Sequence, residues 1–158
     1  MGRADENLTK VHVTFRDGGG EFMWAKAIEG DLFAIRNLPF VACGLNFGDV
    51  VLAPDRAGVR EVQRVVRPSG HRTLRIVFGD HVSEPEQEHY LNAMREHGGS
   101  GERATARLVA IDAPPEADFE TMVAVLTCCE TMGELHFETC EARVPGSFDD
   151  VHEGDVAA

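Results

Sequence analysis

The first half of the chain alternates short apolar segments with turn-forming residues, a pattern that is typical of a small β-rich unit. Residues 11–15 are rich in β-branched side chains and are followed by Asp17 and three consecutive glycines, which indicate a hairpin turn. Residues 21–28 place Phe22 and Trp24 on one strand face, because every second side chain points the same way. Further strands are expected at residues 32–35, 50–53, 59–66 and 72–78. Strands of this number and length favour a small antiparallel β-barrel or half-barrel.

The second half of the chain changes to a helical period. Ser83 and Glu86 form a capping box that predicts the start of a helix, and Gly98 predicts its end. A second helix is expected at residues 118–132, where apolar side chains recur at i, i+3, i+4 and i+7 from Phe119. Strands are expected at residues 104–111 and 135–144. The element order from residue 72 is therefore β-α-β-α-β, which predicts two helices on one side of a mixed sheet.

We expect an α+β protein in which these two halves pack against each other. The predicted boundaries are a β-rich unit at residues 8–71, a β-α-β-α-β unit at residues 72–144 and an acidic disordered tail at residues 145–158. A chain of 158 residues is long enough for one domain or two small units, and its core needs neither disulfides nor metals. The tail is rich in Gly, Asp and Glu and offers little apolar surface to bury.

The charge of the chain is distributed unevenly. The chain carries 15 basic and 27 acidic side chains, and this formal net charge of −12 disfavours nucleic acid because phosphate would be repelled. Residues 1–75, however, carry a net charge of +2 and residues 76–158 a net charge of −14. The acidic half would steer a basic partner toward the chain, and such association weakens with salt.

Six arginines fall between residues 56 and 75, opposed there only by Glu61. The simpler explanation is structural: these arginines lie on an exposed sheet face or form ion pairs with acidic residues of the same chain. The functional alternative is a surface that docks an anionic partner, since arginine forks suit carboxylates and phosphates. Its candidate residues are Arg60, Arg64 and Arg67. RNA binding through Arg60, Arg64 and Trp24 is a third hypothesis, which the aromatic content of 7% disfavours.

The hydropathy of the chain and its cysteines bear on its compartment. No apolar run approaches the roughly 20 residues that span a bilayer, and the N-terminal residues lack the apolar region of a secretory signal. We therefore expect a cytoplasmic protein without a membrane partner, in which cysteines persist as thiols. The four cysteines form no C-x-x-C pair and are expected to be small buried hydrophobes; they are Cys43, Cys128, Cys129 and Cys140. A single reactive thiol at Cys43 is the functional alternative.

Catalytic and metal-binding motifs are absent from the sequence. It contains no G-x-S-x-G nucleophile elbow, no H-E-x-x-H zinc motif and no EF-hand loop. Ser69 and His71 lie in an expected turn, and Glu86 and His89 match only half of a di-iron helix motif. The glycines at residues 98–101 follow a helix C-terminus, where the dipole repels phosphate, and are expected to be a flexible connection. We therefore expect no catalytic residue, no metal and no cofactor, and favour a protein that is not an enzyme.

Several motifs along the chain resemble one bacterial family. They are Trp24-Ala25, Asn37-x-Pro39-Phe40, Gly48-Asp49-Val50-Val51, Ser69-Gly70-x-x-Thr73-x-Arg75 and residues 110–115. The resemblance covers about residues 10–145, and the family is catalogued as domain of unknown function 4265. It implies a small stand-alone bacterial cytoplasmic protein and carries no established activity, so it assigns no catalytic residue.

Two classes of function stay open at this point. The leading hypothesis is a non-enzymatic binding or regulatory protein that acts on a protein partner through a charged surface, for example as an immunity or adaptor protein. The alternative is a small-molecule-binding protein or enzyme with a pocket between the two units. Its candidate lining residues are Trp24, Asn37, Phe40, Cys43, Asp49 and Arg75. For Asn37 and Asp49 a structural role is the simpler expectation, because such side chains cap turns and accept backbone N–H bonds.

Overall fold

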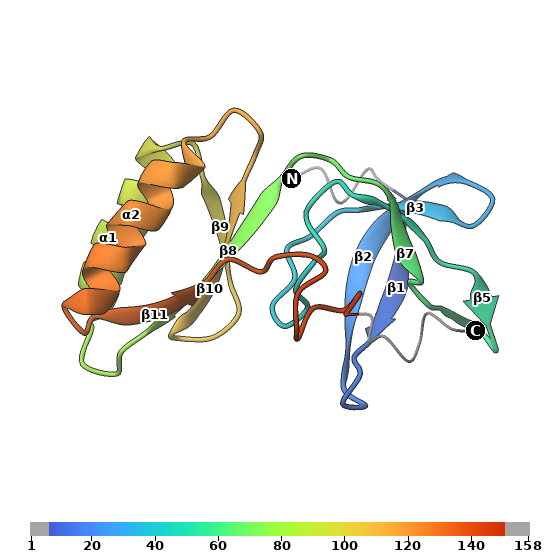
Figure 1. The fold of residues 1–158 in the computed structure, drawn as a ribbon, viewed down its shortest axis with the longest axis horizontal. Coiled ribbons are helices and arrows are strands. Elements are labelled where there is room, and N and C mark those ends of the chain that lie inside the picture. The colour runs from blue at the N-terminus through green and yellow to red at the C-terminus, as the bar shows by residue number, and fades with distance from the viewer. Residues whose placement is uncertain (1–6, 151–158) are drawn as a thin grey trace. The chain divides into compact units, whose positions relative to one another are not determined.

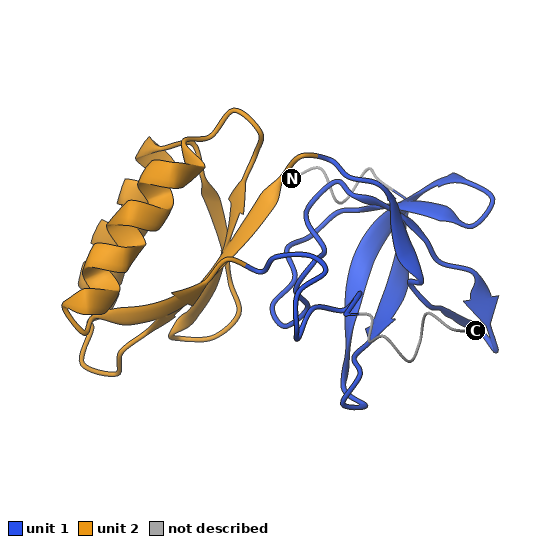
Figure 2. Cartoon of the chain, viewed as in Figure 1, with its two compact units in different colours: residues 1–69, 140–158 blue, residues 70–139 orange. Residues whose placement is uncertain are grey.

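The computed structural model describes residues 7–150, which fold into two compact units. Unit 1 contains the residues up to Ser69 together with those from Cys140 onward, and unit 2 spans Gly70–Thr139 (Figure 2). Of the tail expected at residues 145–158, residues 145–150 belong to unit 1 and residues 151–158 lie outside the described part of the chain. Among residues 7–150, no helix has the length and apolar character needed to cross a membrane.

Unit 1 is built on an open antiparallel sheet of five strands in the order β1-β2-β3-β4-β7 (Figure 1). These strands are β1 (Leu8–Thr14), β2 (Gly20–Glu29), β3 (Leu32–Ile35), β4 (Val50–Leu52) and β7 (Arg64–Arg67), and a separate hairpin joins β5 (Asp55–Arg56) to β6 (Val59–Arg60). Alternation along β1 and β2 places Val11, Val13, Met23 and Ala25 in the core of unit 1. The opposite face of these two strands consequently carries their exposed side chains.

The sequence predicted a barrel or a half-barrel for unit 1. The prediction of a closed barrel is wrong, because the two edge strands β1 and β7 do not pair with each other. The segment after β6 meets β1 through one parallel bridge between His12 and Glu61, followed by a 2.8 Å hydrogen bond from Val62 N to His12 O. From Arg64 onward the chain pairs with β4, at the other side of the sheet. Only three residues separate β6 from β7, which is too few to form a strand that pairs along β1. Strand β7 is therefore an edge of the sheet.

Unit 2 is a four-stranded sheet with both helices on one face (Figure 1). Its elements are β8 (Arg72–Phe78), α1 (Glu84–Glu96), β9 (Ser100–Arg103), β10 (Leu108–Ala113), α2 (Phe119–Thr131) and β11 (Leu135–Glu138), and its strand order is β11-β8-β10-β9. This β-α-β-β-α-β arrangement is that of the ferredoxin-like motif. Alternate residues of β8, namely Leu74, Ile76 and Phe78, pack with Met122 and Leu126 of α2 in its core.

The expected mixed sheet and the β-α-β-α-β order are wrong, because they omit strand β9 and because every strand pair of unit 2 is antiparallel. The glycines that we expected to form a flexible connection lead into β9, where Gly101 pairs with Ile111. A Cβ on Gly101 would lie 3.1 Å from Ile111 Cδ1, and one on Gly99 would lie 2.8 Å from Met122 Cε. These glycines therefore serve close packing rather than flexibility.

Both helices begin at the residues that the sequence predicts. Ser83 Oγ accepts a 3.3 Å hydrogen bond from Glu86 N at the start of α1. At the start of α2, Asp118 accepts hydrogen bonds from Thr121 N at 3.2 Å and Thr121 Oγ1 at 2.7 Å. These two hydrogen bonds lower the pKa of Asp118 below its ordinary value, because they stabilise the charged carboxylate.

Candidate functional site

A groove of about 1210 Å³ lies on the surface of unit 1. Its lining residues come from three segments, within residues 44–49 before β4, 63–68 along β7 and 142–150 after unit 2. All three segments belong to unit 1. Small-molecule pockets usually measure about 300–1,000 Å³, so a groove of this size suits a longer ligand.

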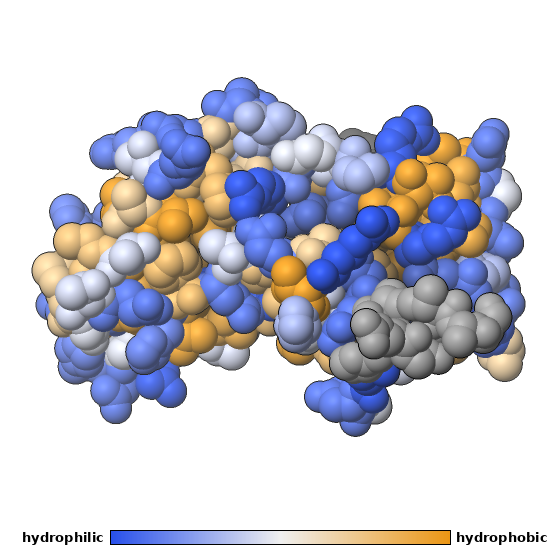
Figure 3. Space-filling view, viewed as in Figure 1, coloured by the Kyte–Doolittle hydropathy of each residue, from blue (hydrophilic) through white to orange (hydrophobic). Residues whose placement is uncertain are grey.

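Strand β7 forms one wall of the groove and is the edge of the unit 1 sheet. Within residues 7–150, β7 pairs with β4 alone. No strand of this described part pairs with the other side of β7, so its outward backbone N–H and C=O groups can accept a further strand, with a register shift at Val66 that makes their spacing irregular. Arg64 and Arg67 are exposed and Val66 is 41% exposed, so the edge presents both charged and apolar side chains. Figure 3 shows exposed hydrophobic side chains next to strongly hydrophilic ones over unit 1.

The two aspartates at the C-terminal end of the groove are bound by nearby groups of the same segment. Asp149 Oδ1 accepts hydrogen bonds from Arg143 N at 2.8 Å and from Ser147 Oγ at 2.7 Å. Asp150 Oδ2 accepts one from Gly146 N at 3.1 Å. These contacts fold residues 143–150 into a compact turn. The ion pairs found within the described residues, by contrast, include neither Arg64 nor Arg67.

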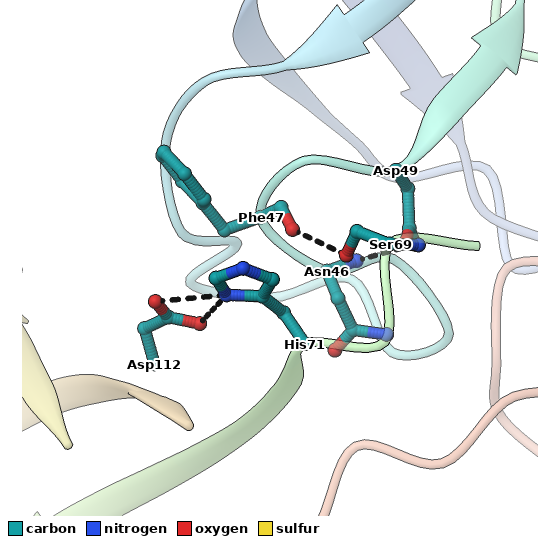
Figure 4. Close-up of polar contacts among 6 residues, drawn as sticks. All are labelled: Asn46, Phe47, Asp49, Ser69, His71 and Asp112. Carbon is teal, nitrogen blue, oxygen red and sulfur yellow. Dashed lines mark hydrogen bonds and ion pairs between the residues drawn. The ribbon is translucent and has the colours of Figure 1, made fainter. Parts of the chain in front are cut away.

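Asp49, one of the predicted ligand-binding residues, lies in the groove wall with a structural role. Its side chain is buried, Oδ2 accepts a 2.9 Å hydrogen bond from Asn46 N and Oδ1 a 2.8 Å bond from Ser69 N (Figure 4). Ser69 also donates its hydroxyl hydrogen to Phe47 O at 2.6 Å. Asp49 thus fastens the loop before β4 to the chain after β7, which shapes the groove.

The loop containing Asn37 and Phe40 is held by Glu21, a residue that the sequence did not single out. The Glu21 carboxylate accepts hydrogen bonds from the backbone N–H groups of Phe40 at 2.7 Å, Val41 at 3.2 Å and Ala42 at 2.9 Å. Asn37 Oδ1 accepts a 2.9 Å hydrogen bond from the backbone N–H of Trp24 on β2. The predicted residues of this loop therefore have structural partners. No local sequence signal marks Glu21, because its partners lie about 20 residues away in the chain.

Two of the four cysteines are brought together in unit 1. The Cys43 and Cys140 sulfurs lie within 4.8 Å of each other, although the residues are 97 positions apart in the sequence. Cys43 is half-buried and Cys140 is buried. The expectation that all four cysteines are buried is wrong for Cys43 and for Cys128, which is exposed, and the alternative of a single reactive thiol at Cys43 missed its neighbour. The other two cysteines, Cys128 and Cys129, lie on α2, and burial raises the pKa of Cys129.

Three further candidate residues lie outside the groove lining. Arg60 donates a 2.6 Å hydrogen bond to Asp31 Oδ1, and its guanidinium lies 5.2 Å from the centroid of the Phe33 ring, so internal pairing accounts for Arg60. Arg67 is exposed at the end of β7, between the lining residues Val65 and Pro68, but does not itself line the groove. Trp24 is 38% exposed on the outer face of β2.

Unit 2 contains the last predicted ligand-binding residue, Arg75. It is buried on β8, and its Nε donates a 2.7 Å hydrogen bond to Glu138 Oε1. The predicted ligand-binding set is thus divided between the units. Near Arg75 in the sequence, His71 Nδ1 lies 2.8 Å from Asp112 Oδ1 and 3.1 Å from Asp112 Oδ2 (Figure 4). Burial raises the pKa of Asp112, and the contact with His71 opposes this rise.

The open sheet of unit 1 and the ferredoxin-like unit 2 define a two-unit α+β protein. Residues 21–137 match the model of the domain of unknown function DUF4265, so the chain belongs to this family, as its motifs predicted. Its fold is similar to the crystal structure of a hypothetical protein from Neisseria gonorrhoeae, with a TM-score of 0.73 and 19% sequence identity over 87% of this chain and 95% of that one. At this identity the likeness concerns the fold alone. The chain matches no curated protein.

Proposed function

We propose that this chain is a non-enzymatic binding protein that captures an extended acidic segment of a partner protein along strand β7. The observation that carries the proposal is an edge strand that lies in the wall of a 1210 Å³ groove. A peptide that adds as a further strand obtains main-chain hydrogen bonds from the edge and specificity from its alternate side chains. A groove of this volume accommodates such a segment better than a compact small molecule.

The charges along β7 support an acidic partner. Arg64 and Arg67 are exposed at the edge, and guanidinium groups bind carboxylates through paired hydrogen bonds. The groove's own carboxylates at Asp149 and Asp150 already accept hydrogen bonds from their segment. Unit 1 is nearly neutral between residues 7–69 and 140–150, with nine basic and ten acidic side chains. Unit 1 therefore has no large negative charge of its own that would oppose an acidic segment.

An immunity or adaptor role in a bacterial cytoplasm is the biological form that we propose for this binding activity. Exposed valine on the same edge favours a partner segment in which acidic and apolar residues alternate, because a strand presents its two faces in turn. Nucleic acid is the less favoured ligand, since a polymer of phosphates carries much more negative charge than a short acidic segment and the chain has a formal net charge of −12.

A displayed library of peptides of about ten residues, in which acidic and apolar positions alternate, tests this proposal. We expect binders whose affinity, measured by fluorescence anisotropy, falls about tenfold or more in the Arg64→Glu/Arg67→Glu double variant. Arg56→Glu is the control for charge reversal elsewhere on unit 1, to be compared with Arg64→Glu alone, because Arg56 is exposed on β5, outside strand β7 and the groove lining. Methylation of alternate backbone nitrogens in the peptide should also abolish binding, since it removes the donors that strand addition requires.

Three results would overturn the proposal. They are a library without any binder, a binder that is indifferent to the β7 double variant, and tighter binding of a single-stranded oligonucleotide than of any peptide at the same salt concentration. A metabolite that raises the melting temperature in a thermal-shift screen, without competing with the peptide, would favour the small-molecule alternative elsewhere on the chain.

A further inference from the structure

We propose that Cys43 and Cys140 form an oxidisable dithiol, a modification site that closes to a disulfide by thiol–disulfide exchange. Their sulfurs lie within 4.8 Å of each other in unit 1. The two cysteines are contributed by separate parts of the chain, the loop before β4 and the segment that follows unit 2. Closing the pair would therefore covalently fasten the C-terminal segment to the loop at the end of the groove.

The backbone geometry at this pair is compatible with a disulfide. Gly44 N donates a 3.0 Å hydrogen bond to Cys140 O, and Phe148 N donates a 3.0 Å bond to Cys43 O. The first bond places the peptide group that follows Cys43 directly against Cys140, so the two cysteines lie on neighbouring stretches of backbone, as a disulfide requires. Rotation of the two side chains, with a small adjustment of the backbone, is then sufficient to bring the sulfurs together.

The backbone at Cys140 is unusual in a way that fits this site. Its φ of 53° lies in the left-handed region, which residues with a side chain seldom adopt. Such a conformation persists only where the surrounding contacts hold it, and it fixes the direction of the Cβ atom. Here the hydrogen bond from Gly44 to the Cys140 carbonyl is one of these contacts.

The other two cysteines do not offer the same chemistry. Cys128 and Cys129 are neighbours on α2, where successive side chains diverge by about 100° around the helix axis. Burial raises the pKa of Cys129, which leaves less of the thiolate that reacts. Cys43, in contrast, is half-exposed, and an oxidant can reach it before the buried Cys140.

The reaction needs a small disulfide as the oxidant, for which glutathione disulfide is the natural probe. The Cys43 thiolate attacks one sulfur of that disulfide, forms a mixed disulfide and releases one thiolate, which takes up the proton lost by Cys43. The Cys140 thiolate then attacks the Cys43 sulfur, closes the internal disulfide and releases the second thiolate, which takes up the proton lost by Cys140. The protein is oxidised by two electrons, and the small disulfide is reduced to two thiols.

The test is oxidation of the full chain with glutathione disulfide, followed by acid quenching and alkylation. We expect an intact mass lower by about 2 Da before alkylation, and faster migration in a non-reducing denaturing gel because the bond closes a loop of nearly 100 residues. Proteolytic mapping should join the peptides that contain Cys43 and Cys140. The Cys128→Ser/Cys129→Ser double variant should keep both changes, and Cys43→Ala should lose them.

Three results with these variants would overturn the proposal that Cys43 and Cys140 form a disulfide. A Cys128→Ser/Cys129→Ser chain that forms no internal disulfide at any ratio of reduced to oxidised glutathione overturns it, provided that circular dichroism shows a native fold. So does a Cys43→Ala chain that still gains the mobility shift. A map that joins Cys43 to a cysteine of α2 also overturns it.

Discussion

Removal of the Glu21 carboxylate should selectively destabilise unit 1. Glu21 is half-buried on β2 and accepts hydrogen bonds from three successive backbone N–H groups, at distances of 2.7, 3.2 and 2.9 Å. Hydrogen bonds to a charged group contribute about 1.5–3 kcal/mol each when they are shielded from water. Because the N–H of exposed Val41 can be hydrated instead, we expect Glu21→Ala to lower the free energy of unfolding by about 2–4 kcal/mol in total.

Trp24 provides the assay, because it is the sole tryptophan of the chain and lies on β2 of unit 1. With a denaturant slope of about 2 kcal/mol per molar urea, the expected loss moves the unfolding midpoint of Trp24 fluorescence down by about 1–2 M. Glu29→Ala is the matched control, since Glu29 is an exposed glutamate at the end of the same strand. Equal midpoints for Glu21→Ala and wild type would refute the assignment of Glu21 as the residue that holds this loop.

Three other predictions concern individual side chains. Gly44→Ala should destabilise unit 1 by about 1–2 kcal/mol more than Gly30→Ala in the same urea assay, because both have positive φ but only at Gly44 would a Cβ meet neighbouring atoms, 3.1 Å away at the nearest. The pKa of Asp118 is lowered, so its contribution to stability is present above the ordinary pKa near 4 and is lost as pH falls through its folded value. The stabilities of Asp118→Ala and wild type, followed by helical circular dichroism, should therefore converge in acid. For Asp112, whose pKa is raised, the sign is opposite: its contribution to stability is present below the ordinary pKa near 4 and is lost as pH rises through the folded value. Urea unfolding at increasing pH should therefore show a weaker fall in Asp112→Asn than in wild type.

Local signals in the sequence predicted the helices well. Ser83 caps α1 by accepting a hydrogen bond from the residue three positions on, and α2 was predicted from apolar residues that recur within two turns from Phe119, so both signals lie within a short window of the sequence. Strand β9 was missed for a different reason. Gly101 in this strand and Gly99 just before it indicate flexibility when they are read alone, and their packing against Ile111 becomes visible only when the strands are placed side by side.

The candidate site was predicted less completely, because it depends on contacts between distant segments. Asp49 and Arg64 were predicted for two different sites, a small-molecule pocket and a partner-docking surface, and the structure brings both into the lining of one groove of unit 1. Glu21 and Cys140 were missed because their partners lie far away in the sequence. Arg75 was predicted to line a pocket between the units, and no local signal indicated its partner Glu138, which lies 63 positions away in the sequence.

The division of unit 1 into two chain segments has a consequence for the order in which the protein can fold during synthesis. Phe148 packs against the core of unit 1, yet it is translated only after all of Gly70–Thr139. Unit 2 has no such delay, because its first and last strands, β8 and β11, are neighbours in one sheet and come from one continuous segment. Since nascent chains fold as they emerge from the ribosome, unit 2 can fold completely before the C-terminal segment of unit 1, from Cys140 onward, has been synthesised.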